Sequence, residues 1–169
     1  MKSATLIVTS LFVLGSLNWM IIAKERVLKT GRTVLCELAP RDPRSLMQGD
    51  YMVLQYSVAA AAAARVPADV FDGHIILTLN ENDVATFQRF DNGTPLASGE
   101  VRIRFRRRHQ GFRRAAIQLG AESYFFQEGR AQEFEKAKYG ELKVAPDGES
   151  ILVGLRNLEL EPLPRPTAN

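Results

Sequence analysis

The chain has 169 residues, of which 46% are hydrophobic and 24% charged, a balance typical of one folded domain with a short appendage rather than of a disordered segment. Its formal net charge of +3 is too small to indicate a nucleic-acid partner. The single cysteine, Cys36, excludes an intramolecular disulfide and a multi-cysteine zinc site, and the two histidines, His74 and His109, predict no metal centre.

The first segment of the chain is long and apolar enough to cross a membrane. Residues 4–23 contain no charge, and at about 1.5 Å per residue a helix of this length spans roughly the thickness of a bilayer core. Trp19 lies near its end, where interfacial aromatic residues are common. A cleaved signal peptide would have a shorter apolar region, and Ile21-Ile22-Ala23 is a poor cleavage site. We therefore expect an uncleaved signal-anchor helix over residues 1–23.

The charges around this segment predict conflicting orientations. Lys24, Arg26, Lys29 and Arg32 follow it, against Lys2 before it, and the positive-inside rule then places the following domain in the cytoplasm. A two-residue tail before an apolar run and a large domain is instead typical of an exported chain. We favour the second interpretation, which is a single-pass protein of the inner (cytoplasmic) membrane with an extracytoplasmic domain.

The rest of the chain is predicted to be mainly β. Residues 24–32 are expected to form a juxtamembrane stalk that ends near Gly31, and residues 33–169 one barrel-like or sandwich-like domain. Six alanines predict a short helix over 59–64, and apolar spacing predicts a second over 131–138. Alternating or β-branched runs between turn signals predict strands. These strands are 33–38, 50–58, 75–79, 84–90, 101–106, 115–119, 124–127, 141–144 and 151–160.

Residues 100–114 carry a run of arginines on a predicted strand. Side chains alternate along a strand, so Val101, Ile103 and Phe105 face one side and the first arginines face the other. The basic residues of interest are Arg102, Arg104, Arg106, Arg107 and Arg108. One interpretation is a solvated face partly neutralised by acidic residues within 122–161. The other is contact with anionic lipid or an acidic partner, worth about 1 kcal/mol per basic residue. Nucleic acid is not expected, because single-strand binding needs aromatic residues on the basic face.

Residues 40–56 join a turn to the start of a strand. Asp42-Pro43 suits the first two positions of a type I turn, and Asp50 is placed to pair with Arg41 or Arg44. Gly49 permits a positive φ just before the strand begins.

Two tyrosines fall on opposite faces of this strand. Met52, Leu54 and Tyr56 share one face, and Tyr51 lies on the other. Leu54 and Tyr56 are therefore expected to pack in the core or against a partner.

Ser45 raises the hypothesis of a serine hydrolase. It precedes Met47 and Gly49-Asp50, which is similar to the serine, methionine and Gly-Asp pattern of signal-peptidase-type enzymes. A Ser–Lys dyad needs a lysine that can lose its proton, and none occurs between Lys29 and Lys136. Arginine cannot replace it as a base. No catalytic residue and no cofactor is therefore predicted.

The same stretch carries a family resemblance. Gly49-Asp50-Tyr51, Leu54 and Tyr56 match the motif that names the GDYXXLXY proteins, and Asp42-Pro43-Arg44 resembles the family's lead-in. Residues 128–144 are similar to a second block of the family, which includes Tyr139-Gly140-Glu141. One departure is the loop 80–83, where the family pattern implies a glycine.

The resemblance implies a membrane-associated bacterial protein without an assigned activity, whose relatives often accompany multispanning membrane proteins. Our leading hypothesis is a membrane-anchored, non-enzymatic accessory domain, held in the bilayer by residues 4–23, that binds a membrane-protein partner. An anchored hydrolase and an anionic-lipid or ligand-binding domain are the alternatives.

Overall fold

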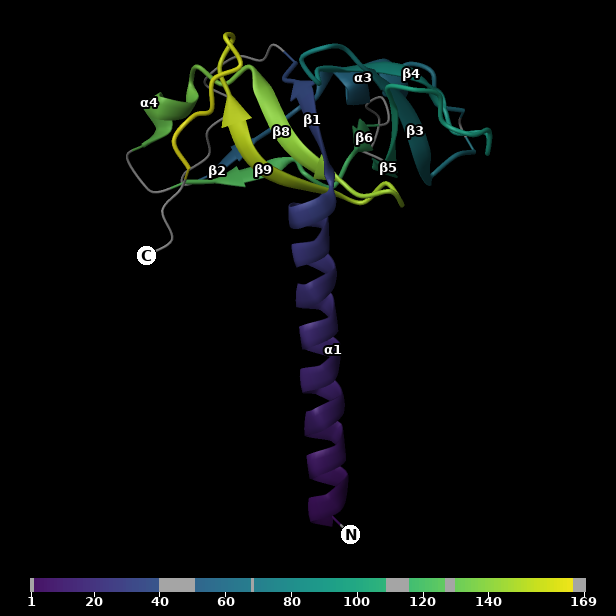
Figure 1. Cartoon of the computed structure of the whole chain (residues 1–169), viewed down its shortest axis with the longest axis vertical. Helices are drawn as coiled ribbons and strands as arrows, with labels where there is room; N and C mark the ends of the chain where they lie inside the picture. Colours follow the sequence, from purple (N-terminus) through teal and green to yellow (C-terminus); the bar gives the residue numbers. More distant parts are fainter. Residues whose placement is uncertain (1, 40–50, 68, 109–115, 127–129, 166–169) are drawn as a thin grey trace.

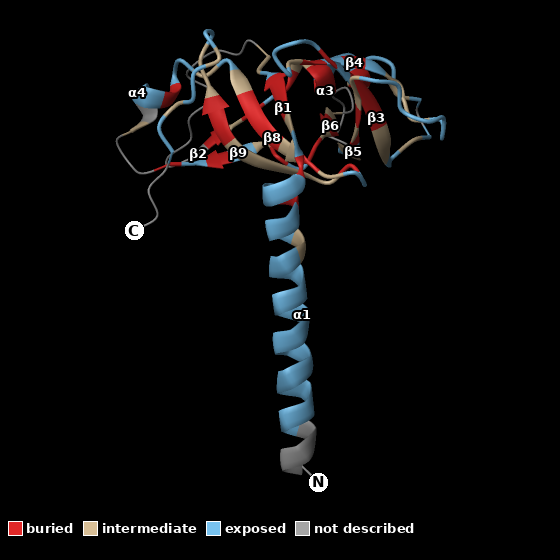
Figure 2. Ribbon diagram, in the orientation of Figure 1, coloured by how far each residue is buried: buried red, intermediate tan, exposed pale blue. Residues whose placement is uncertain are grey.

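The computed structural model describes residues 2–39, 51–67, 69–108, 116–126 and 130–165, and it consists of one long helix that projects from a mainly β domain (Figure 1). Helix α1 spans Lys2–Thr30 and contains one stretch long and apolar enough to cross a membrane. Its apolar side chains are exposed along almost the whole helix, which is pale blue in Figure 2. The predicted stalk is therefore a continuation of this helix, except that Arg32 already belongs to the first strand.

The helix passes into the domain without a linker. The Gly31 N–H donates to the Val27 carbonyl at 2.8 Å, and β1 (Arg32–Glu37) begins at the next residue. A Cβ on Gly31 would lie 2.4 Å from that carbonyl oxygen, so a larger residue cannot make this turn without a shift of the backbone. Val27 is buried against the domain, which fixes the last turn of α1 to the sheet.

Three antiparallel sheets form a curled half-barrel. One has the order β1-β8-β9, with β8 at Tyr139–Val144 and β9 at Ser150–Arg156. A two-stranded sheet pairs β2 (Tyr51–Val53) with β7 (Ser123–Phe125). The third has the order β4-β3-β5-β6, with bounds Ala85–Phe90, Asp72–Leu79, Glu100–Arg108 and Ala116–Gln118. The prediction of a mainly β domain with two short helices is confirmed.

The core lies between the sheets and under the helix α3 (Ser57–Ala63) (Figure 2). The strand alternation predicted for β5 is confirmed, because Val101, Ile103 and Phe105 are buried. Small alanine side chains let α3 pack closely, and Ala59 and Ala62 are buried there. The helix α4 (Ala131–Phe134) closes another side of the core through Phe134, whose ring lies 5.3 Å from that of Tyr124.

Several predicted bounds need correction: the strand predicted over 151–160 ends at Arg156, and the helix predicted over 131–138 ends at Phe134. The strand predicted over 50–58 ends at Val53, and α3 begins at Ser57, two residues before the alanine run, with the extended residue Tyr56 as its N-cap. In the loop 80–83, Asp83 adopts the positive φ of 58° that glycine would take most easily. The Asn80 side chain supports this loop by accepting from the N–H groups of Asn82 and Val84 at 2.9 and 3.0 Å.

Candidate functional site

The named motif contributes to the core where the structure describes it. Leu54 and Tyr56 are each 1% exposed, so both are core residues. Tyr51 opens β2 opposite Phe125. The motif residues Gly49 and Asp50, and the lead-in residues Asp42, Pro43 and Arg44, lie outside the described residues.

Tyr56 joins three distant segments. Its ring lies over Gly140 in β8, where an added Cβ would be 2.8 Å from Tyr56 Cε1. Its hydroxyl donates to the carbonyl of Ala121. Its backbone forms an isolated bridge with Leu38, just after β1. Burial raises the pKa of Tyr56 well above its usual value, so the phenol stays protonated and keeps donating.

Gly140 and Glu141, which belong to the second block of the family resemblance, also make contacts that hold the domain together. Gly140 provides the space that the Tyr56 ring occupies. The next residue, Glu141, is 8% exposed, and its Oε2 lies 2.9 Å from Nε of Arg156 on β9. The guanidinium also donates to the Leu160 carbonyl at 2.8 Å. This pairing ties β8 to β9 and to the chain that follows.

Hydrogen bonds from the motif residues Leu54 and Tyr56, and to the Glu122 carboxylate within the loop, fix the loop 119–122. The Glu122 side chain accepts from the N–H groups of Leu119 and Gly120. The Glu122 carbonyl accepts from the N–H of Leu54 at 2.7 Å. Together with the Tyr56 to Ala121 bond, these contacts place the loop beside the end of α1, where it lines two adjoining cavities.

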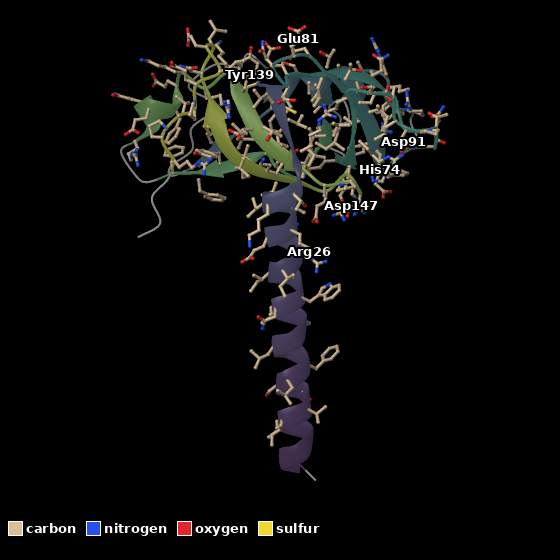
Figure 3. The ribbon with its side chains drawn as sticks, viewed as in Figure 1. Arg26, His74, Glu81, Asp91, Tyr139 and Asp147 are labelled. Carbon is tan, nitrogen blue, oxygen red and sulfur yellow. The ribbon has the colours of Figure 1, made fainter. Side chains whose placement is uncertain are left out.

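The turn before β9 closes the other side of these cavities. Gly148 has a φ of 88°, and its carbonyl accepts from the Arg104 N–H at 2.8 Å. A Cβ there would lie 2.8 Å from Cδ2 of His74, so only glycine fits without a shift. Asp147 and His74 lie on the side of the domain that faces α1, and Glu81 lies on the opposite side (Figure 3). The turn therefore carries Glu149 to the end of the helix.

We call the basic cavity of this region the junction pocket; it has a volume of about 340 Å³ and lies where α1, β5 and the turn before β9 meet. A cavity of this size can hold a small polar group. Lys24 of α1 forms an ion pair with Glu149 across it. The lining residues are Lys24, Arg104, Phe105, Arg106, Gln118, Leu119, Gly120, Glu149 and Ser150.

Two of the predicted arginines, Arg102 and Arg107, have partners inside the domain, whereas Arg104 and Arg106 line the junction pocket. Arg102 lies 2.6 Å from Oδ2 of Asp91, whose pKa is lowered first by the Gly93 N–H and also by this guanidinium. Arg107 donates to the Pro67 carbonyl at 2.8 Å. Arg104 and Arg106 are exposed and line the junction pocket, and neither has an ion pair within the described part of the chain. Arg108 is exposed at the end of β5. The acidic partner of Arg102 thus comes from a loop before β5 rather than from 122–161.

The other candidate nucleophiles do not form a site in the described residues. Cys36 is fully buried, and burial raises its pKa to about 12, so it is a packing residue rather than a thiolate nucleophile. Ser45 lies outside the described residues. Lys143 donates to Oγ1 of Thr33 at 2.9 Å. Within the described ranges, no group of three or more His, Cys, Asp or Glu side chains is placed to hold a metal ion.

Lys24 and Glu149 were not predicted to belong to a site. Lys24 is the first charge after the apolar run, and Glu149 follows the Pro146-Asp147-Gly148 turn, so each had a local signal. Nothing local indicated that the two would meet.

A sequence model of the GDYXXLXY protein family matches residues 13–155, from within α1 to the penultimate residue of β9. The match includes both motif blocks. No curated protein and no solved structure shows a significant similarity to the chain.

Proposed function

The chain belongs to the GDYXXLXY protein family, and from this premise we propose that it is a membrane-tethered, non-enzymatic accessory domain that binds a multispanning membrane protein. The observation that carries the proposal is α1, an exposed apolar helix that continues into β1 without a flexible linker. Such a helix in water would expose a large apolar surface, whereas a bilayer would cover it. The domain would then sit directly at the membrane surface, on the extracytoplasmic side of the inner membrane.

The two-stranded sheet offers a contact surface for the partner. Ser123, at the start of β7, and Leu28 of α1 line the same cavity, so this sheet begins next to the helix end. Phe125 is 67% exposed and pairs in register with Tyr51 of the named motif. An exposed aromatic residue just above a bilayer is within reach of the loops of a neighbouring membrane protein.

Membrane tethering is tested by alkaline carbonate extraction of membranes that contain the full chain. The chain should stay in the pellet, and Leu14→Arg with Leu17→Arg should move it to the supernatant, because two charges near the middle of α1 oppose insertion. Recovery of the unaltered chain in the supernatant would contradict the tether. A reporter fused after Asn169 reports the side of the membrane, and cytoplasmic activity would overturn the proposed orientation.

Partner binding is tested by photocrosslinking in native membranes. A benzophenone amino acid replaces Phe125, and a matched variant carries it at Glu81, which lies on the opposite side of the domain (Figure 3). We expect a discrete adduct with a multispanning protein from position 125 and none from position 81. Equal labelling from both positions, or none from either, would contradict partner binding through this sheet.

A further inference from the structure

The junction pocket has an excess of positive charge at a defined height along the helix. Lys24 is the first charged residue after the apolar run, and Leu28, one turn later, lines the adjoining cavity. One helical turn rises about 5.4 Å, which is similar to the depth of one headgroup layer of a bilayer. If α1 crosses the bilayer, as proposed above, the pocket lies at the level of the lipid phosphates.

The charges in the pocket are arranged for an anion. Arg104 and Arg106 project from the same face of β5 because they are two residues apart. Lys24 is already paired with Glu149, so the two guanidinium groups carry the net positive charge of the lining. Arg102, on the same face, is neutralised by Asp91 and does not line the pocket. Among the three arginines on this face, the two without an ion pair in the described residues are therefore the two that line the cavity at the end of α1.

We propose that the junction pocket binds the phosphodiester of an anionic lipid headgroup through Arg104 and Arg106, beside the Lys24–Glu149 pair. Guanidinium groups match the planar spacing of two phosphate oxygens and can donate to both. A headgroup that carries its own cation, such as phosphatidylcholine, would bring a positive charge towards two arginines and Lys24. A headgroup with a phosphate and hydroxyls only, such as phosphatidylglycerol, avoids that repulsion. This proposal rests on the membrane tether but not on the protein partner.

The test is native mass spectrometry of the full chain in detergent with equimolar phosphatidylglycerol and phosphatidylcholine. The unaltered chain should retain one phosphatidylglycerol in preference to phosphatidylcholine. Arg104→Gln with Arg106→Gln should weaken phosphatidylglycerol binding by about 30-fold, which is the loss of two basic contacts near a membrane surface.

The matched control is Arg26→Gln with Arg32→Gln, which removes the same charge near the same end of α1 but outside the pocket lining. Its binding should fall by less than about threefold, since it keeps the two direct contacts. Equal losses in both double variants, or no preference in the unaltered chain, would overturn the proposal.

In a further measurement, inorganic phosphate is added to the chain with bound phosphatidylglycerol before native mass spectrometry. Displacement of the lipid by millimolar phosphate would assign the pocket to a free anion and overturn the lipid assignment, and retention of the lipid supports it. The carbonate extraction distinguishes the two failures. A chain that stays in the membrane without lipid preference contradicts only the pocket, whereas a chain that is extracted contradicts the tether.

Discussion

Gly140→Ala tests whether Tyr56 is the element that locks the β8 segment to the named motif. The new Cβ would lie 2.8 Å from Tyr56 Cε1, 3.3 Å from its hydroxyl oxygen and 3.5 Å from Leu152 Cδ1. The ring cannot move aside easily, because it is 1% exposed and its hydroxyl is bonded to Ala121. Overpacking of this kind costs about 1–3 kcal/mol of stability. Alanine loses less conformational entropy than glycine on folding, which offsets about 0.5–1 kcal/mol of this cost. The net loss of stability should be about 1–2 kcal/mol.

The assay is thermal unfolding of the full chain in detergent, where this loss corresponds to a midpoint about 2–8 °C lower for a chain of this length. Gly154→Ala is the matched control, because its Cβ would meet only Glu141 Oε2, at 4.0 Å, and it should leave the midpoint unchanged or slightly higher. In a Tyr56→Leu background, Gly140→Ala should cost almost nothing, and in a Tyr56→Phe background it should still be costly because Cε1 remains. Additive effects in the Tyr56→Leu background would refute the packing argument.

Three further predictions concern buried polar groups. Glu141→Gln should lower stability by about 1–3 kcal/mol, because it leaves the half-buried Arg156 guanidinium without its charged acceptor; an unchanged unfolding midpoint would contradict this. Tyr124→Phe should raise the midpoint, since that hydroxyl is buried without a hydrogen-bond partner in the described residues, and a lower midpoint would mean that it has one. Burial raises the pKa of Cys36 from 9.0 to about 12, so the unfolded chain loses this proton first and folding stability should fall as pH rises from 9 towards 12. Urea unfolding at several pH values measures this slope, about 1.4 kcal/mol per pH unit at most. Cys36→Ala should show a shallower slope, and equal slopes would contradict the assignment.

Features with a local cause were predictable from the sequence. The alternation along β5 placed Val101, Ile103 and Phe105 in the core because the period of a strand is two residues. The length of α1 followed from an uninterrupted apolar run, and the position of α3 from the alanines, apart from its first two residues.

Features that depend on contacts between distant segments were not predictable in the same way. The motif predicted that Tyr56 would be packed, but its partners Gly140 and Ala121 meet it only after β8 and the loop 119–122 are in place. The junction pocket likewise needs the last turns of α1, one face of β5 and the turn before β9. The arginine run predicted a basic surface, and the structure restricts the unpaired arginines of the pocket to Arg104 and Arg106.

The central claim is that α1 lies in a bilayer with the domain at its surface, and the fluorescence of Trp19 tests it most directly. Trp19 is the only tryptophan in the chain, is 72% exposed in the isolated molecule and lies five residues before Lys24. It should therefore lie about 7 Å below the level of that lysine along the helix. In liposomes, we expect blue-shifted Trp19 emission that brominated lipids quench and aqueous iodide does not. Emission typical of an indole in water, quenched by iodide and not by brominated lipids, would contradict it.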